Sequence, residues 1–292
     1  MYSNMTTGIK IKRFLYIPAV YVVIYIILAS YNYYIFLNES FMIDYKILKN
    51  IISVIFYFFG IMALVCHTLV VLVDPGSFNL KIVREILQGN EKERCRKCDD
   101  LRPIRAHHCS KCLRCFMRLD HHCPWVFNCV GIGNQKIFYL FLIYTILTTL
   151  MSFVMLIICL VAHRKELLFY TNVKLRKMDF LENSYRIFGN ELKGAEHYLL
   201  IIFGIIMNFL TFTFVGGLFV SQTTLMAHNI TNIENDIYED DETENPFYSK
   251  KAQLKWVLSL MECKQKWKIF LPIVEPNLHN GGYVFGVLNQ SY

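Results

Sequence analysis

Four long stretches without a charged side chain constrain the fold of this 292-residue chain more than any other feature. They cover residues 14–37, 51–73, 137–162 and 198–227. Each is longer than the roughly 20 residues that an α-helix needs to cross a bilayer. Because 54% of the residues are hydrophobic and only 18% are charged, too little polar chain remains to cover four buried core helices. We therefore predict an all-α polytopic membrane protein with four transmembrane helices.

The distribution of Lys and Arg sets the expected orientation of these helices. Basic residues precede the first helix within residues 1–13, and twelve more lie in the loop 74–136. Both termini and that loop are therefore predicted to be cytosolic, which places the loop 163–197 in the lumen. The lumenal loop also holds seven Lys and Arg, so charge alone does not decide the orientation. In the cytosolic tail 228–292, mixed apolar and basic residues at 251–268 predict an amphipathic helix beside the membrane.

The formal net charge of +7 admits two interpretations, a phosphate ligand or the ordinary positive-inside excess at an anionic leaflet. The second is preferred, because the sequence contains no nucleic-acid motif and no internal repeat. Nucleic acid is therefore not expected among the partners, whereas the lipid bilayer is.

Seven of the ten cysteines lie between residues 95 and 129, in the loop that is predicted to be cytosolic. An odd count in a reducing compartment argues against a disulfide framework. Cys-x-x-Cys pairs instead place two thiolates on one zinc ion, and a structural zinc site takes four protein ligands. Six cysteines and two histidines would supply the eight ligands of two such sites. One cysteine is then left over.

Cys123 is the cysteine left over, because it belongs to no Cys-x-x-Cys pair and directly follows Asp120, His121 and His122. A thiol attacks a thioester as the thiolate, so it needs a base for its proton and a carboxylate to hold that base. His121 and Asp120 have the required chemistry. The alternative, in which Cys123 is one more zinc ligand, is weakened by the full spacing, Cys-x2-Cys-x9-His-Cys-x2-Cys-x2-Cys-x4-Asp-His-His-Cys-x5-Cys.

Two segments, Arg-Ala-His-His-Cys at 105–109 and Asp-His-His-Cys-Pro-Trp-Val at 120–126, resemble the DHHC-type protein palmitoyltransferases. The likeness extends to Asp-Pro-Gly at 74–76, to Asn-Cys-Val-Gly at 128–131 and to the four-span layout. It implies a small, irregular or β-containing zinc-binding domain at 74–136, between the second and third helices, that carries the active site.

The resemblance also implies which residues hold two structural zinc ions, a pairing that spacing alone does not give. The ligands of the first ion would be Cys95, Cys98, His108 and Cys115. The ligands of the second ion would be Cys109, Cys112, His122 and Cys129. His107 is kept as an alternative to His108.

The reaction that the resemblance implies is transfer of a palmitoyl or similar acyl group from acyl-CoA to Cys123 and then to a membrane-proximal cysteine of a substrate protein. His121 is expected to act as the base and Asp120 to orient it. Acyl or substrate binding is expected to involve Trp125, Thr231 and Asn232. The enzyme would belong to the endomembrane system, in the ER or Golgi, with its active site in the cytosol, and an accessory subunit is left open.

Two positions depart from the family pattern. Phe127 stands where an Asn is usual. The Thr-Thr-x-Glu motif after the last helix is matched best by Thr-Asn-Ile-Glu at 231–234, so Asn232 replaces the second Thr and is expected to reach Asp120 by a hydrogen bond. The Asn232 change keeps a catalytically inactive homologue open as an alternative. A second alternative is a membrane-anchored zinc-binding adaptor, in which all seven cysteines are structural.

Overall fold

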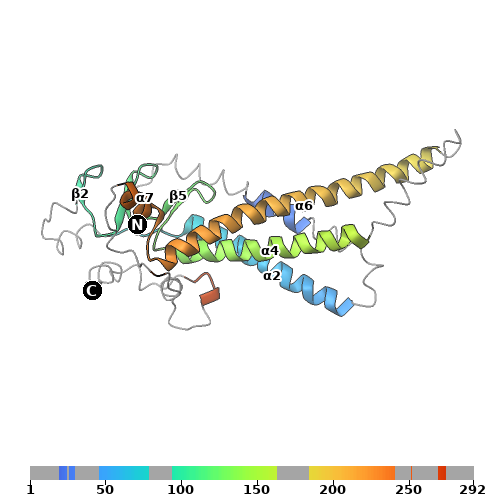
Figure 1. Cartoon of the computed structure of the whole chain (residues 1–292), viewed down its shortest axis with the longest axis horizontal. Coiled ribbons are helices and arrows are strands. Elements are labelled where there is room, and N and C mark those ends of the chain that lie inside the picture. The colour runs from blue at the N-terminus through green and yellow to red at the C-terminus, as the bar shows by residue number, and fades with distance from the viewer. Residues whose placement is uncertain are drawn as a thin grey trace. The chain divides into compact units, whose positions relative to one another are not determined.

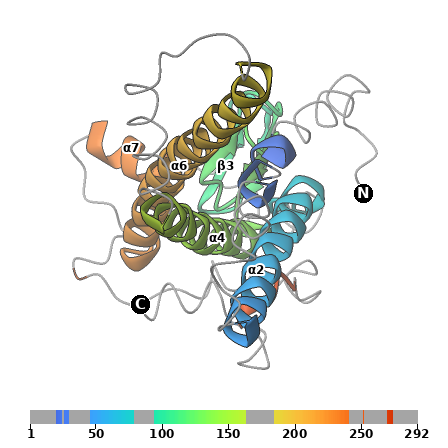
Figure 2. The same cartoon turned by 90° about the vertical axis from the view of Figure 1, so that its right-hand side faces the viewer.

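The computed structural model of the protein describes residues 20–24, 26–29, 46–78, 94–162, 184–240, 251 and 269–273. Three long helices dominate these ranges (Figure 1 and Figure 2). They are α2 (Lys46–Leu72), α4 (Gln135–Ala162) and α6 (Ser184–Ala227). A short helix, α7 (Asn232–Asp240), follows α6.

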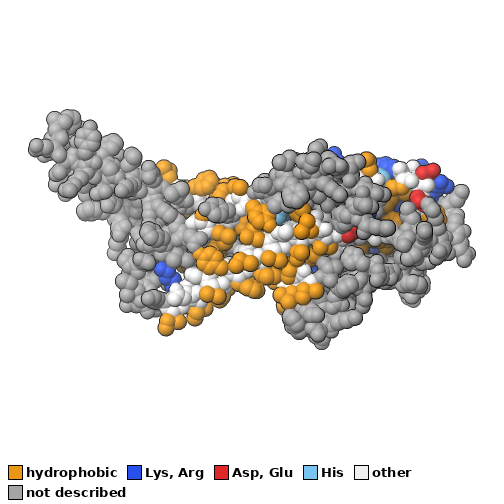
Figure 3. All heavy atoms as spheres, turned by 180° about the vertical axis from the view of Figure 1, so that it is seen from behind, with side chains coloured by type: hydrophobic (Ala, Val, Ile, Leu, Met, Phe, Trp, Pro, Cys, Tyr) orange, Lys and Arg blue, Asp and Glu red, His pale blue; other side chains and the backbone are white. Residues whose placement is uncertain are grey.

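Three helices in the described part of the chain are long and apolar enough to cross a membrane, over Ile47–Leu72, Gln135–Ile158 and Ile201–Ala227. Large apolar side chains on them, such as Val54 and Phe209, are exposed, which is costly in water and expected in lipid. Figure 3 shows hydrophobic side chains over the visible face of the described helices, with few charged ones among them.

Three of the four predicted spans correspond to long apolar helices in the described part of the chain. The predicted spans 51–73, 137–162 and 198–227 are helical. Of the predicted first span, 14–37, only residues 20–24 and 26–29 are described, and both are helical, so a fourth span is not confirmed. Helix α6 begins at Ser184, inside the predicted lumenal loop, whose residues 163–183 lie outside the described ranges. The tail segment predicted as an amphipathic helix also lies outside them, apart from Lys251.

The chain divides into two compact units, which we name the strand unit and the helical unit. The strand unit comprises Met1–Tyr21, Met62–Ile143 and Gly217–Tyr292, and the helical unit comprises Val22–Ile61 and Tyr144–Gly216. The helical unit is held by apolar contacts, with Leu156 and Ile201 at its most buried cluster. Every residue predicted for the functional site belongs to the strand unit.

Three antiparallel hairpins follow one another in the strand unit, each pairing two neighbouring strands. Their strands are β1 (Arg94–Cys95), β2 (Asp100–Leu101), β3 (Ala106–Cys109), β4 (Arg114–Met117), β5 (His121–Cys123) and β6 (Asn128–Val130). Each hairpin tip contains one residue with positive φ, namely Asp99 (52°), Leu113 (55°) and Phe127 (44°). Asn tolerates this left-handed conformation better than Phe does, which gives a physical reason for the Asn that is usual at position 127.

Two asparagines tie the third hairpin to the carboxyl end of α2. The amide of Asn128 donates to the carbonyls of Val70 at 2.8 Å and Val73 at 3.0 Å. The amide of Asn134 donates to the carbonyl of Val70 at 3.4 Å and to that of Cys129, in β6, at 2.9 Å. Because the last carbonyls of a helix have no partner within it, these bonds stabilise the end of α2 while they position β6.

The Asp-Pro-Gly turn after α2 packs closely against the chain that follows β6. A Cβ atom at Gly131 would lie 2.4 Å from the carbonyl oxygen of Pro75, and one at Gly133 would lie 2.3 Å from that of Asp74. Only glycine fits at such distances. The turn thus holds the chain that follows the third hairpin, which carries the predicted nucleophile, close to the carboxyl end of α2.

Candidate active site

The first cluster of metal-ligating side chains joins the first two hairpins. Cys95 and Cys98 come from the β1–β2 hairpin, while His108 and Cys115 face each other in the register of β3 and β4. The sulfur of Cys98 lies 3.1 Å from Nδ1 of His108 and 3.6 Å from the sulfur of Cys115. All four ligand atoms lie within 4.8 Å of one another. We call these four residues the first cluster.

The second cluster joins the second and third hairpins in the same way. His122 and Cys129 face each other in β5 and β6, and Cys109 and Cys112 come from the β3–β4 hairpin. Nδ1 of His122 lies 3.7 Å from the sulfur of Cys109, 3.4 Å from that of Cys112 and 3.6 Å from that of Cys129. Here too all four ligand atoms lie within 4.8 Å of one another.

Both clusters suit a tetrahedral zinc ion. Three thiols and one imidazole form a common structural zinc donor set, and zinc–ligand bonds of about 2.0–2.3 Å separate the ligand atoms by roughly 3.5 Å. The cysteines of both clusters are free and form no disulfide bonds. The structure thus brings together the two ligand sets implied by the family resemblance. His107, the alternative ligand, instead points Nε2 toward Oε1 of Glu234 at 3.7 Å.

Strand β5 separates the reactive side chains from the metal ligand. Successive residues of a strand point to opposite faces, so His121 and Cys123 share one face and His122 lies on the other. Cys123 is buried and belongs to neither cluster among the described residues. Nδ1 of His121 donates a hydrogen bond to Oδ2 of Asp120 at 2.7 Å, and the side chain of His121 also contacts that of Cys123.

Asp120 is fully buried, and four hydrogen bonds from described residues reach its carboxylate. Oδ2 accepts from Nδ1 of His121 at 2.7 Å, from Nε2 of Gln222 at 2.8 Å and from Nδ2 of Asn232 at 2.7 Å. Oδ1 accepts from the backbone N–H of Asn232 at 2.9 Å. Burial raises the pKa of Asp120, but the hydrogen bonds outweigh it and hold the pKa below its usual value. Asp120 therefore stays ionised.

The imidazole between Asp120 and Cys123 is poised to hold a proton. Burial lowers the pKa of His121, but its hydrogen bonds with Asp120 and Cys123 outweigh burial and raise the pKa to about 9. A protonated imidazole beside a thiol favours the thiolate, which is the nucleophilic form of cysteine.

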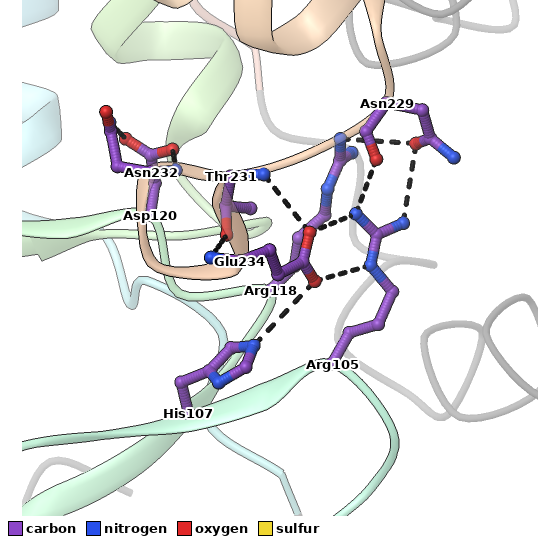
Figure 4. A network of polar contacts seen from close by, with 8 residues as sticks. All are labelled: Arg105, His107, Arg118, Asp120, Asn229, Thr231, Asn232 and Glu234. Atoms are coloured by element: carbon purple, nitrogen blue, oxygen red, sulfur yellow. Dashed lines mark hydrogen bonds and ion pairs between the residues drawn. The ribbon is translucent and has the colours of Figure 1, made fainter. Parts of the chain in front are cut away.

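A polar network anchors the start of α7, as Figure 4 shows. Thr231 and Glu234 form a capping box, in which the N–H of Thr231 donates to Oε2 of Glu234 at 3.1 Å and the N–H of Glu234 donates to Oγ1 of Thr231 at 3.2 Å. Glu234 also accepts two hydrogen bonds from Arg105, at 2.7 and 2.6 Å. Burial raises the pKa of Glu234, but Arg105 and His107 more than offset this and lower it to about 2.

Two of the three predicted acyl- or substrate-binding residues, Thr231 and Asn232, belong to this network. Thr231 is buried and serves as the N-cap of α7, which directs the first N–H of that helix, on Asn232, toward Asp120. Trp125 is 51% exposed, and its carbonyl accepts a hydrogen bond from Nε2 of His67 at 3.3 Å. Thr231 and Asn232 are thus held by hydrogen bonds within the protein, and Trp125 is half exposed.

Gln222 is the site residue that sequence reasoning missed. It lies in an apolar stretch, and the only signal for it is an amide near the end of that stretch. A polar side chain in a membrane segment marks a functional or packing contact, but the sequence does not name the partner.

Comparison with known proteins agrees with this geometry. A family model described as DHHC palmitoyltransferase matches residues 88–239. The chain is 38% identical to palmitoyltransferase ZDHHC3 of Homo sapiens over 149 residues, which cover 49% of this chain and 46% of that protein. It is 34% identical to palmitoyltransferase ZDHHC7 of Rattus norvegicus over 211 residues, covering 70% and 60%.

A plant relative gives the same result over a shorter segment. The chain is 39% identical to probable protein S-acyltransferase 12 of Arabidopsis thaliana over 124 residues, which cover 38% of this chain and 43% of that protein. In these first matches the chain spans about half the length of the curated relatives.

Proposed function

This chain belongs to the DHHC palmitoyltransferase family, and on that premise we propose that it is a protein S-acyltransferase. It would carry a long-chain acyl group, palmitoyl above all, from acyl-CoA through Cys123 to cysteines of other proteins. One observation carries the proposal. Of the seven cysteines between residues 95 and 129, only Cys123 lies outside the two clusters, and it contacts the imidazole that Asp120 holds.

In the first step, the Cys123 thiolate attacks the carbonyl carbon of acyl-CoA. A new carbon–sulfur bond forms, the bond to the CoA sulfur breaks, and the proton held on His121 goes to the departing CoA thiolate. Asp120 remains ionised throughout and keeps the Nδ1–H of His121 pointed toward it. The products of this step are acylated Cys123, free CoA and a neutral imidazole.

In the second step, the neutral imidazole of His121 accepts the proton of a substrate thiol. The resulting thiolate attacks the acyl group on Cys123, and Cys123 leaves as the thiolate beside the newly protonated imidazole. The enzyme thus returns to its starting state, with the acyl group on a cysteine of the substrate protein.

Zinc is the metal that the donor sets favour at both clusters, with Cys95, Cys98, His108 and Cys115 holding one ion and Cys109, Cys112, His122 and Cys129 holding the other. With four protein ligands each, both ions would be structural and would fix the hairpins. His122 would then fix the backbone between the base and the nucleophile.

The helices give the acyl chain an apolar environment. Three of them are long and apolar enough to span a bilayer, and burying a long acyl chain among them is favourable because it removes apolar surface from water. We infer that Cys123 lies at the cytosolic surface of an endomembrane, ER or Golgi, that Trp125 flanks the entrance for the acyl chain, and that substrate cysteines lie close to the membrane.

Acyl transfer to Cys123 is tested with a fluorescent palmitoyl-CoA and the purified full-length chain. We expect hydroxylamine-sensitive labelling of the unmodified protein and none of Cys123→Ser. Cys66→Ala is the matched control, since Cys66 is a buried cysteine of α2 outside both clusters, and it should label normally. Equal labelling of the unmodified protein and Cys123→Ser would refute the assignment, and no labelling of either would favour the inactive homologue or the adaptor.

A further inference from the structure

We propose that Gln222 is a positioning residue of the acyl transfer, which holds the Asp120 carboxylate from the side of α6 and through it fixes the imidazole of His121. The proposal rests on the proposed function, and it adds a membrane helix to the residues that shape the reactive centre.

The contact is direct and fully enclosed. Nε2 of Gln222 donates to Oδ2 of Asp120 at 2.8 Å, and Gln222 is 4% exposed while Asp120 is 0% exposed. Oδ2 is also the atom that accepts the Nδ1–H of His121. Gln222 therefore acts on the same oxygen that orients the base.

The polar neighbours of Gln222 on α6 behave differently. The hydroxyl of Thr224 donates to the carbonyl of Val220 within the helix. The hydroxyl of Thr223 donates to the carbonyl of Phe219 and also pairs with the hydroxyl of Tyr139 in α4 at 2.8 Å, away from Asp120. Gln222 instead reaches a residue 102 positions away in the sequence. A buried amide without a partner is destabilising, because it loses its hydrogen bonds to water. A glutamine in this apolar helix is therefore favourable because Asp120 lies opposite it.

The Asp120 carboxylate needs such contacts because its own torsion does not fix it. The terminal torsion of an aspartate is broad and roughly two-fold, so the plane of the carboxylate is set by the hydrogen bonds it accepts. The backbone of Asp120 is held by a bond from its N–H to the carbonyl of Val130 at 2.8 Å. Asn232 then contacts the carboxylate from α7, and Gln222 contacts it from α6.

A change in the orientation of the Asp120 carboxylate would displace the imidazole beside the nucleophile. His121 follows Oδ2 through the 2.7 Å bond of Nδ1, and its ring contacts Cys123. Reactions between positioned groups are sensitive to small displacements, and losses of about a hundredfold follow from a misplacement of about 1 Å. Loss of one of four bonds should displace the ring less, so we expect about a tenfold loss.

The other ionisable groups that interact with Asp120 are not altered in the test. His121 contacts the carboxylate directly, and the buried guanidinium of Arg118 lies close enough to interact with its charge. Gln222→Met introduces no charge next to Asp120, and the imidazole of Gln222→His introduces one only when it is protonated.

The experiment compares three variants of the full-length chain in lipid nanodiscs. Gln222→Met keeps the length of the side chain without its donor, and Gln222→His keeps an N–H at a similar reach. Thr224→Val is the control, since Thr224 is exposed and bonds only within its own helix among the interactions described here. The rate of Cys123 acylation by fluorescent palmitoyl-CoA is measured in a single turnover, as a function of palmitoyl-CoA concentration.

We expect Gln222→Met to lower the saturating rate about tenfold and leave the half-saturating concentration of palmitoyl-CoA unchanged. Gln222→His should retain a rate clearly above that of Gln222→Met, and Thr224→Val should match the unmodified protein. A role in packing alone predicts the opposite order, because the imidazole ring changes the shape of the side chain more than methionine does.

The inference is overturned if Gln222→Met keeps the full rate, if only the half-saturating concentration changes, or if the histidine variant is no faster than the methionine variant. Failure of the proposed function looks different. In that case the unmodified protein and Cys123→Ser would be labelled alike, whatever residue stands at position 222.

Discussion

The two metal clusters have the same ligand types, three cysteines and one histidine, but they lie in different surroundings. In the first cluster Cys98 is exposed, and the surrounding hairpin tip carries the exposed ion pair of Arg94 and Asp99. In the second cluster Cys129 is fully buried and packs with Phe116 and Leu119. The first cluster fixes the edge of the strand unit, whereas the second is part of its core and holds the strand that carries Cys123. Identical donor chemistry therefore does not imply an equal share in catalysis.

The sharpest test of this difference is Cys129→Ser. Removal of a buried ligand should release the second ion and free β5 and β6 from each other, so acylation of Cys123 should fall about a hundredfold or more. Metal analysis should show the zinc content drop from two ions per chain to one. A variant that loses its ion and keeps full activity would show that the second cluster does not position the nucleophile.

Cys98→Ser applies the same change to the first cluster. We expect the zinc content to fall from two to one again, but acylation to fall only about tenfold, because the β1–β2 hairpin contributes none of the reacting residues. The two variants are compared in one acylation assay. Equal losses in both would mean that the clusters are not separable in function.

Chelation should distinguish the clusters without mutation. The exposed sulfur of Cys98 gives a chelator access to the first ion, while release of the second requires local opening of the core around Cys129. We expect two phases of zinc release whose rates differ severalfold, with most of the acylation activity lost in the slower phase. A single phase would argue that both ions leave through one common unfolding step.

The smallest effect is expected at the hairpin tips. Phe127→Asn places a residue suited to positive φ at the tip beside the second cluster, and should stabilise the protein by about 0.5–1 kcal/mol. The gain is offset in part by loss of the contact between the rings of Phe127 and His122, whose centroids are 6.2 Å apart. Leu113→Asn, at the equivalent tip of the second hairpin, is the matched control.

Both Asn variants are followed by thermal unfolding. A larger rise in Tm for Leu113→Asn than for Phe127→Asn would measure what the aromatic contact contributes. A fall in Tm for both would refute the strain argument, since neither tip would then gain from a residue that favours the left-handed conformation.

Much of this molecule was accessible from its sequence, because apolar length and cysteine spacing are local signals. Three of the four predicted spans are helices, and Asn232 does bond to Asp120, as expected of the residue that replaces the usual Thr. The first span falls mostly outside the described residues. The pairing of ligands required the family resemblance, because each cluster joins side chains of two successive hairpins, such as Cys98 and His108, which spacing alone does not determine.

Other features were missed for different reasons. The spacing of Thr231 and Glu234 is the signature of a capping box, whereas the family resemblance places Thr231 among the acyl- or substrate-binding residues. Gln222 gives no comparable signal, since its partner is 102 residues away and lies in another element. Contacts of that kind follow from how helices and hairpins pack, which no local pattern encodes.

Strand β3 carries His108 for one cluster and Cys109, the next residue, for the other. In β5 the metal ligand His122 lies between His121 and Cys123 in the same alternating way. Inserting or deleting a single residue within either strand would turn each following side chain to the wrong face. At the positions between 108 and 123 that carry neither a metal ligand nor a reacting residue, substitutions are therefore tolerated far more readily than changes of length. Gaps in this stretch should be absent from any functional homologue.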